Sequence, residues 1–165
     1  IINQDSSIFS IKKGNFDLNA LKVIMNGFFK LNEDGSTSLD LSIENPGTEF
    51  KELFSLIPNA YKGNYKELQS TGDFNLKGRV VGVYNSNRKI YPDWDFILKA
   101  KNGGIQYPGM PVSLQKVNLD LTTANKGPGL DKAFIQINPM SFELNNNLFL
   151  GNLNLTKLSD NTHID

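Results

Sequence analysis

The chain has 165 residues, a length that fits one domain, and its 17 Lys and Arg residues balance 17 Asp and Glu residues. A formal net charge of zero, without clustered positive charge, argues against a nucleic-acid partner and against an electrostatic grip on an anionic membrane surface. The absence of cysteine excludes disulfides, thiolate metal sites and thiol catalysis. Because the chain begins with Ile1 rather than Met, we expect a fragment excised from a longer protein.

Apolar and polar residues alternate along most of the chain, which is the period of a β-strand with one buried face. We expect strands, in chain order, over residues 8–12, 21–31, 38–43, 72–84, 94–101, 117–122, 134–137 and 149–155. Turns are expected at 32–35, at Asn102-Gly103 and at 145–147, and loops at 85–91 and 125–129. The short connections predict a mainly β protein with one long antiparallel sheet.

One segment has the helical period instead of the strand period. Its apolar residues recur at i, i+3, i+4 and i+7 and are Phe50, Leu53, Phe54 and Ile57. Thr48 is a suitable N-cap, and Pro58 ends the helix. We therefore expect one short amphipathic helix near residues 49–57. Because so short a helix is marginal alone, its apolar stripe should dock on the sheet.

The sequence offers little chemistry. The single histidine, His163, lies in a tail (157–165) that we expect to be polar and solvated, which is a poor place for a catalytic imidazole. Asp93 and Asp95 flank Trp94 with their carboxylates about 7 Å apart along a strand, but the solvent face of that strand is the simpler interpretation. We expect no catalytic residue, no metal site and no cofactor.

Long strands with one apolar face must bury that face against a second sheet, a helix or a ligand. If the strands curl into a U-shaped groove or half-barrel, the residues of this face line the concave side. They are Phe74, Leu76, Val80, Trp94, Phe96, Leu98, Leu119, Leu121, Ile135 and Ile137. Acyl chains held there would gain about 0.8 kcal/mol for each buried CH₂ group. The alternative is that the same residues form an ordinary closed core.

Several blocks of the sequence resemble the AsmA family of envelope proteins, in its Bacteroidetes form. The first block is Phe50 to Tyr61, where a short helix ending in Leu-Ile-Pro is followed by an Ala-Tyr pair. Further blocks follow in order at 68–78, 101–108, 117–121 and 142–155, so that the resemblance covers about residues 15 to 156.

The resemblance implies a relative of bridge-like lipid-transfer proteins, with β-sheets rolled into a U-shaped groove lined by apolar side chains. Such proteins are associated with phospholipid movement to the outer membrane and with outer-membrane integrity, and the family has no catalytic residues to carry over. By this resemblance, residues 1–165 are a single AsmA-like β domain in the bacterial periplasm. It would belong to a protein anchored in the inner membrane by a helix outside this chain. The expected partners are phospholipid acyl chains and the rest of that protein, but not nucleic acid.

Two further expectations follow from the β pattern. A curled open sheet has two edges with unpaired backbone groups, so we expect edge-to-edge self-association at high concentration. The alternative function is a cell-surface β-sandwich that binds carbohydrate or protein through an aromatic platform of Tyr84, Tyr91, Trp94 and Tyr107.

Overall fold

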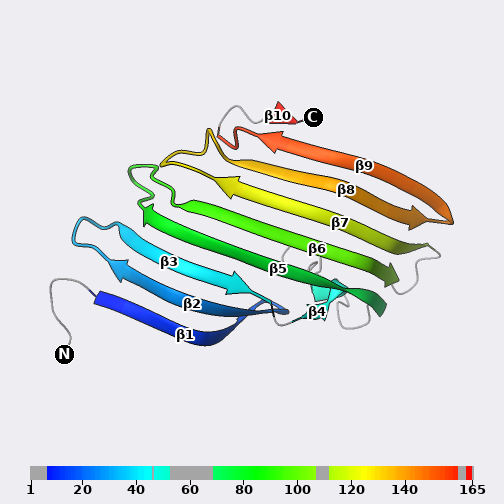
Figure 1. Cartoon of the computed structure of the whole chain (residues 1–165), viewed down its shortest axis with the longest axis horizontal. Coiled ribbons are helices and arrows are strands. Elements are labelled where there is room, and N and C mark those ends of the chain that lie inside the picture. Colours follow the sequence, from blue (N-terminus) through cyan, green and yellow to red (C-terminus); the bar gives the residue numbers. More distant parts are fainter. Residues whose placement is uncertain (1–6, 46, 53–68, 107–111, 160–162, 165) are drawn as a thin grey trace.

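The computed structural model describes residues 7–45, 47–52, 69–106, 112–159 and 163–164. In this part of the chain, ten antiparallel strands form one open sheet of order β1-β2-β3-β5-β6-β7-β8-β9-β10, with β4 attached to β5 (Figure 1). The bounds are β1 Ser7–Leu18, β2 Leu21–Leu31, β3 Thr37–Glu44, β4 Thr48–Glu49, β5 Gln69–Tyr84, β6 Asp93–Gln106, β7 Ser113–Asn125, β8 Phe134–Leu144, β9 Asn147–Thr156 and β10 His163–Ile164. The predicted mainly β class and the antiparallel curled sheet are confirmed.

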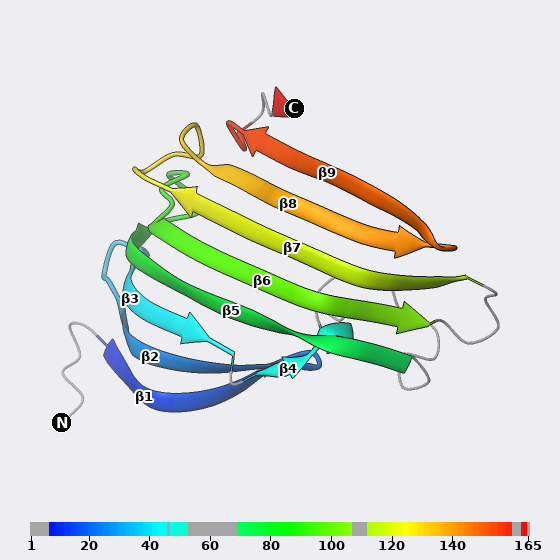
Figure 2. The same cartoon turned by 45° about the vertical axis from the view of Figure 1, so that its right-hand side comes forward.

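The long strands and short turns follow from the local sequence. Burial alternates residue by residue along β5, as its apolar and polar residues do. Asn145 and Asn146, with φ of 52° and 60°, make the two-residue turn between β8 and β9, where asparagine tolerates the left-handed conformation. The sheet does not close on itself: β1 lies at one edge, and β9, with the two-residue β10 beside its end, lies at the other (Figure 2).

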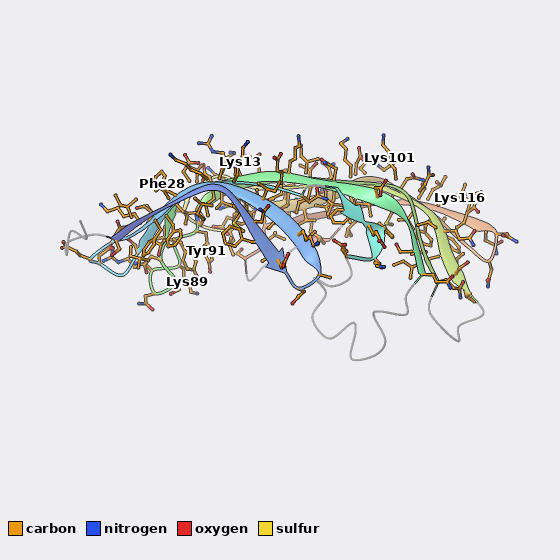
Figure 3. All side chains as sticks on the ribbon, turned by 90° about the horizontal axis from the view of Figure 1, so that it is seen from below. Lys13, Phe28, Lys89, Tyr91, Lys101 and Lys116 are labelled. Atoms are coloured by element: carbon orange, nitrogen blue, oxygen red, sulfur yellow. The ribbon has the colours of Figure 1, made fainter. Side chains whose placement is uncertain are left out.

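The sheet is arched because β-bulges lie side by side on neighbouring strands. Gly72 on β5, Asn102 on β6 and Lys116 on β7 have φ of 77°, 48° and 49°, and each lies at a shift in strand register. The N–H of Asn102 donates to Oδ1 of Asn118 across the strands at 3.0 Å. Figure 3 shows the resulting arch, with Lys101 on its convex side and Tyr91 on its concave side.

The predicted turn at Asn102-Gly103 is therefore wrong. β6 continues through these residues to Gln106, and Asn102 forms a bulge instead of a turn. The physical reason is that an Asn-Gly turn and a bulge both use a residue with positive φ, so the dipeptide suits either structure. The apolar face also resumes beyond it, since Ile105 packs against the buried core.

The predicted helix near 49–57 is also wrong at its start. Thr48–Glu49 form β4, which pairs with Asp73 and Phe74 of β5, and residues 50–52 make a single 3₁₀ turn. The remaining positions of the predicted stripe, Leu53, Phe54 and Ile57, lie outside the described residues.

The reason for β4 is the unequal length of two neighbouring strands. β3 pairs with β5 only as far as Lys77, so on the side away from β6 the backbone of residues 73–76 has no partner from β3. The buried side-chain amide of Asn45 makes two hydrogen bonds to this backbone. Its Nδ2 donates to the Phe74 carbonyl at 3.0 Å, and its Oδ1 accepts from the Leu76 N–H. β4 then pairs with the remainder, because buried backbone groups require partners.

The expected polar tail, 157–165, is only partly a tail. His163 and Ile164 form β10, which pairs antiparallel with Thr156 and Leu155 at the end of β9. Ser159 is held by a 3.0 Å hydrogen bond from its Oγ to Oδ1 of Asp131. β9 has free backbone N–H and C=O groups along its outer side, and β10 pairs with them. The polar composition of residues 157–165 does not predict this pairing.

Candidate ligand-binding face

The strand register places all ten predicted groove residues on one face of the sheet. Because antiparallel partners point to the same side, the pairs Leu76–Leu98, Leu98–Leu121, Leu121–Ile137 and Ile137–Leu153 make one apolar row across five strands. The neighbouring rows are Phe74–Ala100–Leu119–Met140, Gly78–Phe96–Thr123–Ile135–Leu155 and Val80–Trp94. We call the side that carries these rows the concave face.

The register extends this face beyond the predicted residues. Leu41 is paired with Val80, Ile43 with Gly78 and Met25 with Ile43, so β2 and β3 continue the apolar rows. Alternation in residues 21–31 and 38–43 signals these positions, but Ile24 and Phe28 on the opposite face obscure the pattern.

Most of the concave face is half-exposed. Of the ten predicted lining residues, only Phe74 is buried, and the other nine are of intermediate exposure. Within the described residues, the buried hydrophobic cluster is confined to Leu21, Val23, Phe50, Phe74, Ala100 and Val117. Phe50 lies in this cluster against Gly103, where an added Cβ would lie 2.9 Å from its ring. The concave face is therefore covered where Phe50 packs, whereas the rows that run from Leu76 and Val80 across the sheet keep intermediate exposure.

The described residues form a single sheet layer. A sheet closed on itself or packed against a second sheet would hide its apolar rows. No second sheet among the described residues covers the rows that start at Leu76 and Val80, and these rows keep intermediate exposure.

The convex face carries ion pairs between neighbouring strands, together with exposed apolar residues such as Val81, Val83 and Ile97. Arg79 donates from Nε and Nη2 to the two carboxylate oxygens of Asp40, at 2.9 and 2.7 Å, and Lys99 donates to Asp120 at 2.7 Å. Exposed pairs of this kind stabilise little, so they indicate a solvated surface and not a source of stability.

The Arg79–Asp40 pair predicts a small pH dependence. The hydrogen bonds from the Arg79 guanidinium lower the pKa of Asp40 below its ordinary value of 3.8. Their contribution to stability is therefore complete above that value and is lost as the pH falls through the pKa of the folded state. In acid melts followed by circular dichroism, Asp40→Asn and Arg79→Gln should each flatten the fall in melting temperature below about pH 4. A fall that is unchanged in both variants would contradict this.

The predicted aromatic platform shares the concave side. The rings of Tyr84 and Tyr91 lie 6.2 Å apart and tilted, and Trp94 donates from Nε1 to Oγ1 of Thr123 at 3.2 Å. Trp94 lies opposite Val80, within the apolar rows, and Figure 3 shows Tyr91 on the concave side. Tyr107 lies outside the described residues. The described part of the platform therefore lies on the same side of the sheet as the apolar rows.

The acidic pair lies on the other face. Asp95 is paired with Arg79 and is exposed, whereas Oδ1 of Asp93 accepts a 2.7 Å hydrogen bond from the N–H of Gly127. In the described part of the chain, no three His, Cys, Asp or Glu side chains gather in a way that could hold a metal ion. No helix among the described residues has the length and hydropathy to cross a membrane.

A hollow of about 470 Å³ lies where β5 begins, β6 ends and β7 begins. It is lined by Gln69, Ser70, Thr71, Asn102, Gly104, Ile105, Gln106, Ser113, Leu114, Gln115 and Lys116. Its lining mixes amides and hydroxyls with apolar groups, and Ile105 and Leu114 also pack against the buried cluster.

Comparison with known proteins gives no match, since no family model fits the chain and neither a curated protein nor a solved structure is significantly similar to it.

Proposed function

We propose that the concave face shelters the acyl chains of phospholipids, without covalent chemistry. The observation that carries this proposal is the row Leu76–Leu98–Leu121–Ile137–Leu153, which crosses five strands and is of intermediate exposure along its length. A partly exposed apolar row of this continuity is typical of a binding site for apolar ligands.

The dimensions of the row suit an acyl chain. Strands lie about 4.8 Å apart, so a row across five strands is about 19 Å long. One leaflet contributes about half of the roughly 30 Å hydrocarbon thickness of a bilayer, so one acyl chain fits along the row. Because the strands arch along their length (Figure 3), the rows lie along the floor of the groove.

The chemistry of the face predicts the kind of selectivity. Leu, Ile and Val side chains offer burial without directional hydrogen bonds, so binding should increase with acyl-chain length and tolerate different headgroups. By the AsmA-family resemblance, we place this activity in the bacterial periplasm. There the domain would serve an inner-membrane-anchored protein that moves phospholipid and maintains the outer membrane.

Site-specific photo-crosslinking in cells tests the proposal. A photoreactive residue replaces Leu76, Leu98 or Leu121 on the concave face, and each variant is purified and analysed for attached lipid by mass spectrometry. The matched controls are Asn75, Lys99 and Asp120, which form a row across the same three strands on the convex face. We expect phospholipid adducts at the concave positions and at least tenfold less at the convex positions.

Two outcomes would contradict the proposal. Equal labelling of both rows would indicate nonspecific contact with membrane. Labelling of neither row, together with polysaccharide binding that Tyr84→Ala abolishes, would support the alternative carbohydrate-binding function, which rests on the Tyr84–Tyr91 ring pair.

A further inference from the structure

The two edges of the sheet differ in how they are protected from further pairing. An edge strand offers a row of backbone N–H and C=O groups, and natural edges are usually protected by charged residues or bulges. β1 has both kinds of protection. Lys12 and Lys13 lie at a register shift between Ile11 and Gly14, and the Lys13 N–H is turned to Oδ1 of Asn26 at 2.8 Å.

β9, by contrast, has no charged residue in its ten positions, Asn147–Thr156. Among the described residues, β10 covers its outer edge at Leu155 and Thr156 alone. Leu148, Phe149 and Leu150 are 60%, 45% and 76% exposed, on both faces of the sheet. Phe149 already packs within its own copy, since its ring stacks on Phe142 with centroids 5.0 Å apart.

We propose that the outer edge of β9 is an interface that pairs antiparallel with β9 of a second copy of this chain. The copies are related by a two-fold axis perpendicular to the sheet. An uncharged strand meets its own copy without like-charge repulsion, whereas a β1–β1 contact would bring two Lys-rich bulges toward each other. Closed two-fold dimers are the commonest symmetric assembly, and their interfaces are self-complementary in this way.

The geometry also selects the register. Odd-numbered residues of β9 face the concave side, so a dimer that keeps both concave faces together must pair odd residues with odd residues. β10 pairs with β9 at Leu155 and Thr156, so among the described residues the part of β9 without an outer neighbour is 147–154, and its centre lies near Leu150. Leu150 then lies opposite Leu150 of the partner copy, and Phe149 lies opposite Gly151. A cross-strand aromatic–glycine pair of this kind shields the glycine backbone.

The dimer would bring two copies of Leu150 together, which at 76% is the most exposed large hydrophobic side chain of the described residues. It would also join two concave faces into one surface of about twice the length. The pairing does not depend on what binds to that surface, so it can hold or fail independently of lipid binding.

Cysteine crosslinking tests the interface cleanly, because the chain has no cysteine of its own. Leu150→Cys places two thiols opposite each other, within the Cα separation that a disulfide requires. Ile8→Cys on β1 is the matched control, since Ile8 is 62% exposed at the other edge. On mild oxidation of the full 165-residue protein, we expect a covalent dimer at 150 to form at least tenfold faster than one at 8.

Sedimentation measurements complete the test. The unmodified protein should be a concentration-dependent dimer, and Leu150→Lys should raise its dissociation constant at least tenfold, whereas Ile8→Lys should leave it unchanged. A protein that stays monomeric at millimolar concentration would overturn the proposal, as would equal crosslinking at both edges. Chains longer than dimers would also overturn it, because they require β9 to pair with β1 instead of with itself.

Discussion

Truncation of Phe50 to alanine should lower the free energy of unfolding by about 3–5 kcal/mol, the range for large-to-small changes at buried aromatic positions. Phe50 is 2% exposed and belongs to the buried cluster, although it comes from the turn after β4 and not from a long strand. Its ring lies directly against Gly103, which has no side chain of its own to fill the space. The cavity left by truncation would therefore stay open.

Phe16→Ala is the matched control for this prediction. Phe16 is paired with Val23, so it lies on the same face of the sheet as Phe50, but it is 39% exposed at the edge. Because it buries less area, its truncation should cost at most about half as much. Chemical denaturation with urea measures both values. Equal losses in the two variants would show that Phe50 does not anchor the buried cluster.

The position of Phe50 shows what the sequence reasoning could and could not predict. The alternation of apolar and polar residues within a strand can be read from the local sequence, and residues that pair across antiparallel strands point to the same side of the sheet. The ten lining residues could therefore be assigned to one face without knowledge of the register. Phe50 was also expected to dock on this face, but through a helix, because its spacing with Leu53 and Phe54 matches a helical stripe. β4 forms because the backbone of Asp73 and Phe74 on β5 needs hydrogen-bond partners. This is an effect of the tertiary structure, and the local sequence around Phe50 contains no sign of it.

The openness of the face could not be predicted for a related reason. Leu76, Leu98 and Leu121 would be equally suitable in a closed core and in an accessible groove, since both require apolar residues on one side. What separates the two cases is the curvature of the sheet and the absence, among the described residues, of a second layer over these rows. The curvature arises at bulges, and the sequence signals of a bulge overlap with those of a turn. Asn102-Gly103 is the position at which this ambiguity produced a wrong prediction.

Gly72 makes the contribution of the bulges measurable. Its φ is 77°, and an added Cβ would lie about 2.5 Å from the carbonyl oxygen of Asn102 and 2.6 Å from that of Lys101. Both obstacles are backbone atoms of the neighbouring bulge, so they cannot move aside as a side chain can. Gly72→Ala should therefore cost the strain of a left-handed alanine, about 1–2 kcal/mol, together with a displacement of β5 from β6.

Gly35→Ala separates these two contributions. Gly35 has nearly the same φ, 75°, but an added Cβ there meets nothing within 4 Å. We expect about 1–2 kcal/mol of destabilisation at Gly35 and at least about 2 kcal/mol more at Gly72, both measured by urea denaturation. If the bulges set the arch, Gly72→Ala should also reduce acyl-chain labelling at Leu98, which Gly35→Ala should leave unchanged. Equal destabilisation at the two glycines would mean that β5 and β6 can separate at the bulge without cost, and the close contact of their backbones would then not be what holds the sheet in its curved form.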